Sequence, residues 1–247
     1  MSTQRPEAGG SPRGKQLVKF SGHRLGRALR AASPAERREA GRCLELLLAQ
    51  SAARMLTRTY STLGTRADTD FLVWQAADDL ALVMDWHAEL LAALGGRLEP
   101  SHSFLSMTMR SLYANPLHPQ PPDAPGRDRL REDEGGSAYL FVYPMVKTRP
   151  WYALPQAERQ RMMDEHIAIG HRYHRIRINT TYSYGLDDQE FVVAFEGDDP
   201  GEFLAPVRDL RSSEASAYTE RDTPMLTCRR MAPGALVRAL GLGSADA

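Results

Sequence analysis

Two short stretches decide the fold of this chain: "SPAERRE" at residues 33–39 and "LPQAERQ" at residues 154–160. Their shared Ala-Glu-Arg segments begin at residues 35 and 157, which lie 122 residues apart. A fixed spacing between similar segments is the mark of an internal repeat, and a repeat constrains the whole architecture. The first question is therefore whether other segments keep the same spacing.

Further matches keep nearly the same spacing. "TYS" occurs at residue 59 and again at residue 181, also 122 apart. The same spacing places "QLVKFSGHRL" (16–25) on "AYLFVYPMVK" (138–147), and both stretches alternate like strands. Downstream the spacing falls to 120, as in "ADD" at residue 77 and "GDD" at residue 197. These matches predict a duplicated unit.

Each copy of the unit reads as strand, helix, strand, strand, helix, strand. This order is the ferredoxin-like pattern. Two such units side by side predict an α+β fold, with tandem ferredoxin-like repeats forming a dimeric α+β barrel within one chain. The first helix begins with a Ser33-Pro34-x-Glu36 capping box. The other predicted helices are 78–95, 155–173 and 200–213, and the predicted strands are 16–23, 55–62, 70–76, 103–113, 138–147, 176–184, 189–196 and 223–230.

The repeat also predicts the domain boundaries. Residues 15–114 form the N-terminal repeat, and residues 137–232 form the C-terminal repeat. The segment between them, 115–136, is rich in Pro, Gly and charge, which is typical of a linker. Residues 1–14 are predicted to be a disordered arm and residues 233–247 a tail.

Composition excludes several functional classes. The 247 residues are 42% hydrophobic and 25% charged, as in ordinary globular proteins. Lys plus Arg (31) equals Asp plus Glu (31), so no charge excess indicates nucleic acid or an anionic membrane. No apolar run approaches the length of a membrane span, and the N-terminus lacks a signal peptide's apolar core. The two cysteines, Cys43 and Cys228, form no metal spacing. We expect a cytoplasmic protein.

The predicted helix 155–173 carries a histidine on its inward face. His166 belongs to a stripe at helical spacing, whereas His171 and His174 project elsewhere and should be solvated. The first copy has Leu44 at the equivalent position. An inward histidine can simply be a core residue, and alone it is a poor zinc site. One axial imidazole is enough for a haem iron, however. The stripe consists of Met162, His166, Ile169, Gly170 and Tyr173.

The strand 138–147 also differs between the copies. Tyr143 and Lys147 share a face with aromatic residues, and the first copy has Ser21 and Leu25 in their places. That face could belong to an edge strand with its polar side in water, but large aromatic side chains disfavour a fully solvated face. The following strand alternates Ile176, Ile178, Thr180, Tyr182 and Tyr184 with a polar set that lines a pocket or faces solvent: Arg177, Asn179, Thr181 and Ser183.

These residues indicate a site in the C-terminal repeat with an inward His, a Tyr and a Lys. The stretch "YPMVKTRPWYALPQAERQRMMDEH" (143–166) resembles the chlorite dismutase superfamily. Its Tyr-Pro-Met-x-Lys strand is similar to the coproheme decarboxylase branch, which produces haem b in coproporphyrin-dependent haem synthesis. The resemblance extends from about residue 16 to residue 230, and it implies the same duplicated architecture.

The resemblance implies a peroxide-dependent reaction on coproheme (iron coproporphyrin III), which is both substrate and cofactor. His166 would be the proximal ligand of the iron. Tyr143 would be the redox-active tyrosine, whose radical removes a hydrogen from a propionate with release of carbon dioxide. Lys147 would hold the other reacting propionate by charge-assisted hydrogen bonding. The remaining porphyrin contacts that it implies are Tyr113, Met145, Trp151 and Ser216, and Glu214 could orient the His166 imidazole.

One position departs from the family pattern. Thirteen residues after the proximal His, chlorite dismutases carry an Arg and many coproheme decarboxylases a Gln, whereas this chain has Asn179. Asn179 is expected to donate a hydrogen bond to bound hydrogen peroxide. The alternatives are a chlorite dismutase or peroxidase-like haem enzyme, which the missing Arg disfavours, and a non-catalytic haem-binding protein, which would need neither Tyr143 nor Lys147. The resemblance also implies a homopentamer.

Overall fold

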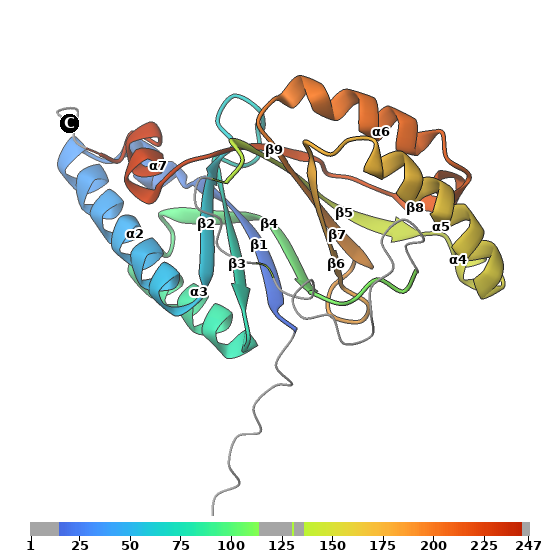
Figure 1. The fold of residues 1–247 in the computed structure, drawn as a ribbon. Helices are drawn as coiled ribbons and strands as arrows, with labels where there is room; N and C mark the ends of the chain where they lie inside the picture. Colours follow the sequence, from blue (N-terminus) through green and yellow to red (C-terminus); the bar gives the residue numbers. More distant parts are fainter. Residues whose placement is uncertain (1–14, 114–129, 131–135, 244–247) are drawn as a thin grey trace, which may run out of the picture.

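The computed structural model of this chain describes residues 15–113, 130 and 136–243 (Figure 1). The predicted arm, nearly all of the predicted linker and the last residues of the predicted tail lie outside these ranges. The first repeat comprises β1 (Leu17–Leu25), α1 (Arg27–Ala31), α2 (Pro34–Arg54), β2 (Leu56–Ser61), β3 (Phe71–Ala77), α3 (Leu80–Leu94) and β4 (Leu98–Met107).

The second repeat has the same order, and its strand β5 and helix α5 begin 122 residues after β1 and α2. The chain ends with an additional helix, α7. These elements are β5 (Tyr139–Lys147), α4 (Arg149–Ala153), α5 (Gln156–His171), β6 (Arg177–Tyr182), β7 (Phe191–Gly197), the 3₁₀ helix η1 (Pro200–Phe203), α6 (Leu204–Arg211), the 3₁₀ helix η2 (Glu214–Tyr218), β8 (Thr219–Arg221), β9 (Leu226–Arg230) and α7 (Pro233–Ala239).

The strands close into one antiparallel barrel. Within the first repeat the strand order is β4-β1-β3-β2, and within the second it is β6-β7-β5-β9. Pairing of β4 with β6 and of β2 with β9 joins the two sheets, while β8 adds to the end of β5. Both strand orders are ferredoxin-like. The predicted α+β fold with two such repeats in one barrel is therefore confirmed.

The interior of the barrel is a core that both repeats share. Strand alternation turns one face of every sheet inward, and the inward residues come from both halves of the chain. This shared core consists of Val18, Phe20, Tyr60, Leu72, Trp74, Ala76, Phe104, Leu140, Val142, Val192, Ala194, Leu226 and Cys228.

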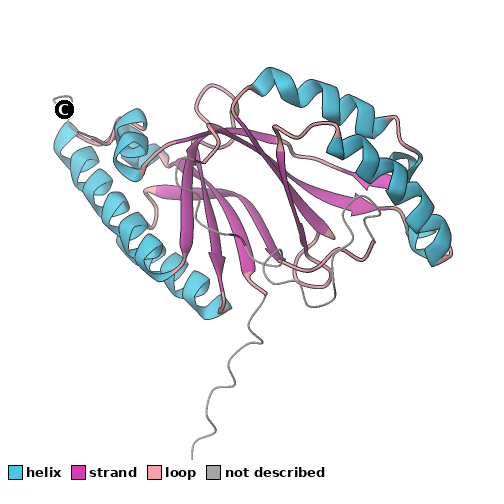
Figure 2. Cartoon of the chain, viewed as in Figure 1, coloured by secondary structure: helices cyan, strands magenta, loops and turns pink. Residues whose placement is uncertain are grey.

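Helices cover the outside of the two sheets (Figure 2). The long helix α2 starts at a capping box, as predicted: Ser33 accepts from the Glu36 backbone, and the Glu36 carboxylate accepts from the Ser33 N–H at 2.9 Å. Together with α3 it covers the first sheet, while α5 and α6 cover the second (Figure 1). None of the helices within the described ranges combines the length and apolar character of a membrane span.

The segment expected to be a tail contains α7, which packs on the first repeat. Leu236, Val237, Leu240 and Leu242 are buried in the same cluster as residues of α2 and α3. Gly41 of α2 lies so close to the Leu242 carbonyl that an added Cβ would be 2.2 Å from its oxygen. The C-terminal helix thus completes the helix layer of the N-terminal half.

Two strand boundaries differ from the prediction. Strand β4 runs from 98 to 107 rather than from 103 to 113. Its early part contains Pro100, and the register against β1 shifts between Gly22 and His23, so a bulge accommodates a run that alternation cannot reveal. The predicted strand 223–230 is shorter, as β9, and the preceding β8 was not predicted.

Candidate active site

Strand β5 separates the barrel core from a second apolar layer beneath α5 and α6. Leu140 and Val142 are fully buried inside the barrel. Phe141, Tyr143 and Met145 point to the opposite side and pack against a cluster of Ile176, Val193, Phe195 and Phe203. The alternation predicted from the sequence is confirmed, and it places the tyrosine on the helix-covered face.

Tyr143 is held as a neutral phenol. Its ring is stacked with Phe195, with centroids 6.0 Å apart. Burial raises the pKa of the phenol, and the Asp222 carboxylate raises it further, while Arg211 partly offsets both. Asp222 itself accepts from Arg211 at 2.7 Å. The hydroxyl therefore keeps its proton at neutral pH, so any oxidation of this side chain has to remove a proton together with an electron.

Lys147 lies four residues after Tyr143 at the end of β5, and its ammonium is buried. The side chain is 7% exposed, and its Nζ donates to the Ala215 carbonyl at 2.6 Å and to Thr219 Oγ1 at 3.4 Å. The same Nζ lies 4.8 Å from the centre of the Trp151 ring, within range of a cation–π interaction. Burial lowers the pKa of Lys147 to about 8, against the raising effect of Glu190.

This ammonium has no acidic partner in the described parts of the chain. Glu190 accepts instead from the Lys147 backbone N–H at 2.8 Å and from the Tyr152 hydroxyl at 2.5 Å. Buried charges are normally paired, because an unpaired charge loses its hydration without compensation. A carboxylate of a bound molecule would supply the missing partner. The site thus fits a ligand with carboxylate side chains.

His166 presents a neutral imidazole with a defined tautomer. The Ser213 hydroxyl donates its hydrogen to the Leu210 carbonyl at 2.7 Å, so its oxygen accepts from His166 Nδ1–H at 3.3 Å. The lone pair therefore lies on Nε2, so Nε2 is the ring nitrogen available to bind a metal. Burial and, to a smaller extent, the nearby Lys147 ammonium lower the pKa of His166 to about 4. The imidazole is consequently available as a ligand at neutral pH.

Ser213, rather than Glu214, is the side chain that orients this imidazole. Glu214 is exposed and forms a bidentate pair with Arg161, with both distances at 2.9 Å. Its role as a partner of His166 is therefore not supported by the geometry. Nothing in the sequence singles out Ser213, because it reaches His166 across 47 positions of the chain. As predicted, His171 and His174 are exposed.

The remaining predicted contacts surround Trp151. Tyr113 packs against it with ring centroids 6.3 Å apart, and both contact the cluster that contains Met162 on α5. Ser216 is half-buried on η2, next to Ala215, whose carbonyl binds Lys147. Met145 lies on the Tyr143 face of β5. These residues thus border the layer between the second sheet and its helices.

Asn179 does not share this layer with Tyr143. It pairs with Ala194 of β7, whose side chain lies in the barrel core, and its amide donates to Glu196 Oε2 at 3.0 Å. Thr181 likewise bonds inward, to Ser106 at 2.7 Å. The prediction that Asn179 contacts bound peroxide is therefore corrected: the strand turns this side chain into the barrel. Of the polar set of this strand, Arg177 is exposed, whereas Thr181 and Ser183 are buried and do not line the expected pocket.

The neighbouring Ile178 occupies the outward position instead. It pairs with Phe195, which belongs to the Tyr143 layer, and it is 43% exposed. The edge of this layer is thus open to solvent at Ile178. Tyr143 packs in this layer, and the Lys147 ammonium lies close enough to His166 to lower the pKa of its imidazole.

A family model described as chlorite dismutase matches residues 37–231, which is most of the chain. The chain belongs to the chlorite dismutase family. Two curated relatives named coproheme decarboxylase are each 31% identical to it. That of Mycolicibacterium smegmatis aligns over 73% of this chain and 75% of its own length, and that of Thermus thermophilus over 74% of each.

Solved structures of the chlorite dismutase family confirm the fold. A variant of the chlorite dismutase from Candidatus Nitrospira defluvii superposes with a TM-score of 0.81, covering 93% of this chain and 97% of that one, at 19% identity. Membership in the chlorite dismutase family agrees with the duplicated barrel.

Proposed function

We propose that this chain catalyses the hydrogen-peroxide-dependent oxidative decarboxylation of two propionates of coproheme, yielding haem b. The observation that carries the proposal is the presence on β5 of a neutral phenol, Tyr143, and of a buried ammonium, Lys147, that forms no salt bridge with any described residue. The curated relatives named coproheme decarboxylase support the same substrate. A simple haem carrier would need neither side chain.

His166, Lys147 and Tyr143 would have separate roles in this reaction. His166 would bind the iron through Nε2, since Ser213 holds its Nδ1–H. Lys147 would hold a propionate by a charge-assisted hydrogen bond, with Trp151 packed beneath the ammonium. Tyr113, Met145 and Ser216 would contact the rest of the porphyrin. The bound iron porphyrin supplies the oxidising equivalents of peroxide.

Tyr143 would carry out the step at the propionate. The phenol gives up one electron and one proton, and the resulting tyrosyl radical takes a hydrogen atom from the propionate chain. Loss of a second electron and of carbon dioxide leaves a vinyl group. In sum, each propionic side chain and one hydrogen peroxide give one vinyl group, one carbon dioxide and two water molecules, so two equivalents of peroxide are consumed per coproheme.

We favour decarboxylation over chlorite cleavage because the side chains of β6 that face this layer include no arginine. Ile178 and Thr180 face outward, whereas Arg177 and Asn179 lie on the face that carries Glu196. Within the described strand, no guanidinium is thus directed at the proposed iron site. The cytoplasmic location and the homopentamer stay predictions.

Mass spectrometry of the porphyrin tests this proposal. The protein is mixed with iron coproporphyrin III, and hydrogen peroxide is added in steps. We expect loss of two carbon dioxide molecules through a three-propionate intermediate. Coproheme binding without any product would contradict the decarboxylase and leave a haem-binding protein, with chlorite as the next substrate to try. Absence of binding would return His166 to the role of a core residue.

Lys147 should make coproheme binding pH-dependent. Propionates stay ionised between pH 6 and 9.5, whereas the pKa of Lys147 in the free protein is about 8. The ammonium that binds the propionate is therefore present below this pH and lost above it, so affinity should fall by up to about tenfold per pH unit above pH 8. A Soret titration at several pH values measures this dependence.

The variant K147M separates this effect from general alkaline loss. Its affinity should be lower at pH 7 and should no longer depend on pH between 7 and 9. K19M, which removes a partly buried lysine from the equivalent sheet of the other repeat, is the matched control and should retain the wild-type profile. An unchanged pH profile in K147M would rule out the proposed propionate contact.

A further inference from the structure

Glu190, directly before β7, connects the end of β5 to the short helix α4. Its Oε2 accepts from the Lys147 N–H at 2.8 Å and from the Tyr152 hydroxyl at 2.5 Å. An O–H···O⁻ contact this short is typical of a charge-assisted hydrogen bond. Burial and the hydrogen bond to Glu190 raise the pKa of Tyr152, so this phenol stays protonated at neutral pH.

The first repeat builds the same junction with a different side chain. Asp70, directly before β3, accepts from the Leu25 N–H at 2.7 Å and from the Arg30 guanidinium at 2.5 Å. Leu25 and Arg30 lie 122 residues before Lys147 and Tyr152, and the two carboxylates are 120 residues apart. An ion pair therefore suffices to hold this junction. The phenol of the second repeat adds an oxidisable group, which the ion pair lacks.

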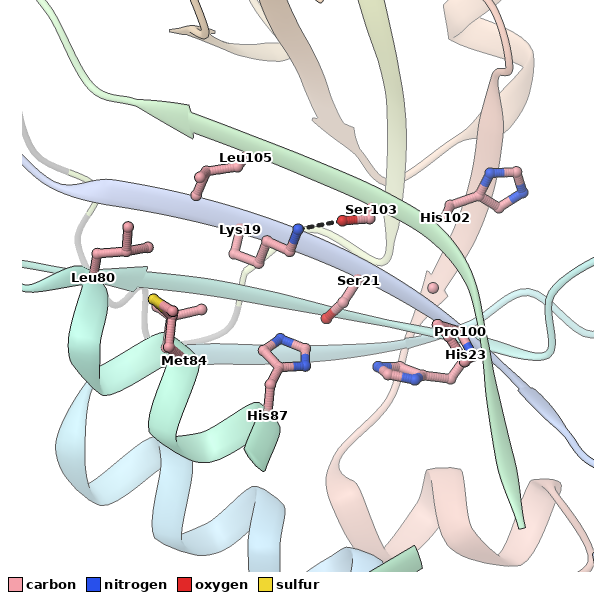
Figure 3. A pocket seen from close by; sticks show the side chains of 12 residues that line it. Lys19, Ser21, His23, Leu80, Met84, His87, Pro100, His102, Ser103 and Leu105 are labelled. Atoms are coloured by element: carbon pink, nitrogen blue, oxygen red, sulfur yellow. Dashed lines mark hydrogen bonds between the residues drawn. The ribbon is translucent and has the colours of Figure 1, made fainter. Parts of the chain in front are cut away.

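The layer beneath the helices differs between the repeats in the same sense. In the first repeat it contains a cavity of about 420 Å³, where Ser21 lies at the position equivalent to Tyr143 (Figure 3). Figure 3 shows Lys19 donating to Ser103 in this cavity. None of the described residues that line it is a tyrosine or a tryptophan. The oxidisable rings of these two equivalent layers thus lie in the second repeat.

Trp151 connects the Tyr152 hydroxyl to the proposed porphyrin site. Its ring is buried, and Tyr152 packs against the cluster to which it belongs. The Lys147 ammonium lies 4.8 Å from the centre of the Trp151 ring. A cation at this distance disfavours a positive charge on the indole, so an oxidising equivalent that reaches Trp151 does not remain there. Tyr152 can instead lose its proton to Glu190 as it loses an electron, which leaves its ring uncharged.

A second tyrosine links Tyr152 to the surface. The hydroxyl oxygens of Tyr152 and Tyr184 are 3.2 Å apart. Because Tyr152 gives its hydrogen to the carboxylate, the Tyr184 hydroxyl donates to the Tyr152 oxygen. Tyr184 is 42% exposed, and none of the other eight tyrosines, all of which lie in the described ranges, is exposed to this extent. A hydrogen atom can therefore pass along this bond from the surface to a Tyr152 radical.

We propose that Tyr184 is the oxidation site of a second activity, a peroxidase reaction on small phenols, and that Tyr152 and Glu190 connect it to the bound haem. The proposal rests on the haem binding of the proposed function. Small phenols are the substrate class because they give up hydrogen atoms readily and can stack on an exposed aromatic ring. Oxidising equivalents that find no propionate are then consumed at the surface.

Each cycle of this route moves one electron and one proton. Tyr152 loses an electron toward the haem and its proton to the Glu190 carboxylate. Tyr184 then gives a hydrogen atom to the Tyr152 oxygen, and a phenol at the surface gives a hydrogen atom to Tyr184. Glu190 returns its proton through solvent to the oxygen that becomes water. Two cycles convert one hydrogen peroxide and two phenols into two water molecules and two phenoxyl radicals.

Guaiacol oxidation by the full chain loaded with haem b tests the proposal. The protein is mixed with hydrogen peroxide and guaiacol, and the coloured product is followed. Y184F and Y152F should each lower the rate about tenfold or more, and so should E190Q, which removes the base. Y152R copies the ion pair that Arg30 forms with Asp70, so it should keep the junction folded and still lose the rate.

Y173F is the matched control. Tyr173 also donates to a carboxylate, that of Asp209 at 2.5 Å, but within the described ranges it is not hydrogen-bonded to another tyrosine. Y173F should therefore oxidise guaiacol at the wild-type rate. Y184F should decarboxylate coproheme at the wild-type rate, because Tyr184 takes no part in the step at the propionate.

A measurement without haem follows the tyrosines directly. Photogenerated tris(bipyridine)ruthenium(III), a soluble one-electron oxidant, is applied to the ligand-free full chain, and electron paramagnetic resonance detects tyrosyl radicals. The signal should be largely lost in Y184F and in Y152F and retained in Y173F. A radical signal that does not depend on Tyr152 would overturn the route.

The outcomes with haem separate this proposal from the proposed function. Equal guaiacol oxidation by the wild type, Y152F and Y184F overturns this proposal alone, since the phenol would then react at the haem itself. Loss of the rate in Y173F but not in Y152F overturns it as well. Guaiacol oxidation that depends on Tyr152 and Tyr184, without decarboxylation of coproheme, supports it and overturns the proposed function. Absence of haem binding overturns both.

Discussion

Replacement of Tyr143 by phenylalanine should abolish carbon dioxide release while leaving coproheme bound. The phenyl ring keeps its stacking on Phe195, whereas the O–H group that supplies the electron and proton is lost. The rate should fall about a thousandfold or more, which corresponds to ~4 kcal/mol of barrier. Product mass spectrometry after peroxide addition measures the rate, and a Soret titration measures binding.

Y139F is the matched control for this variant. Tyr139 lies on the same strand and the same face, four residues earlier. The Y139F variant should decarboxylate coproheme at the wild-type rate, because the radical step requires a tyrosine at position 143 and not elsewhere on β5. Because the pKa of the Tyr143 phenol is raised, the wild-type reaction should also slow in D₂O. Full activity of Y143F would show that the radical step takes place elsewhere.

Replacement of Arg58 by methionine should destabilise the protein by about 3–5 kcal/mol. Arg58 of β2 and Glu196 of β7 are both buried, and Nη1 donates to Oε1 at 3.1 Å. The guanidinium also lies 4.8 Å from the centre of the Trp74 ring. Removing it leaves the Glu196 carboxylate inside the barrel with a hydrogen bond from the Asn179 amide and, at 3.9 Å, the half-exposed Arg177 guanidinium. Urea unfolding of the ligand-free protein measures the loss.

Two comparisons separate an uncompensated charge from lost packing. The double variant R58M/E196L removes both charges and should lose less stability than R58M alone. R54M breaks a pair between Arg54 and Glu89 that is partly open to solvent, so it should cost no more than about 1 kcal/mol. Equal losses in R58M and R54M would mean that the barrel pair contributes no more than a surface pair.

The duplicated architecture could be predicted because its evidence is local and repeated. Strand alternation and the 122-residue spacing fixed which segments correspond, and the pairing of the barrel follows from that. The early part of β4 could not be predicted, since Pro100 lies in a bulge that exists only opposite Gly22 and His23. The α7 segment is too short to indicate that it packs on a helix almost two hundred residues earlier.

The site could be predicted in part, for a related reason. On β5 the alternation of residue types identified the face that carries Tyr143 and Lys147. On β6 the distance from His166 along the chain gave Asn179, but a shift of one residue reverses the face of a strand. The register against β7 is what places Ile178, rather than Asn179, toward the helices. Contacts such as Ser213 to His166 depend on tertiary packing alone.

The helix layers of the two repeats bury unequal amounts of apolar surface. In the described part of the chain, the layer of α2, α3 and α7 contains one cluster of 19 buried residues, whereas the layer of α5 and α6 contains clusters of four and three. Local opening follows buried contacts, so the second repeat is the weaker cooperative unit of the ligand-free chain. A ligand that binds only the folded form protects it by mass action. Proteolysis of the ligand-free protein should then begin at α5 and α6, and the proposed binding of coproheme should slow it.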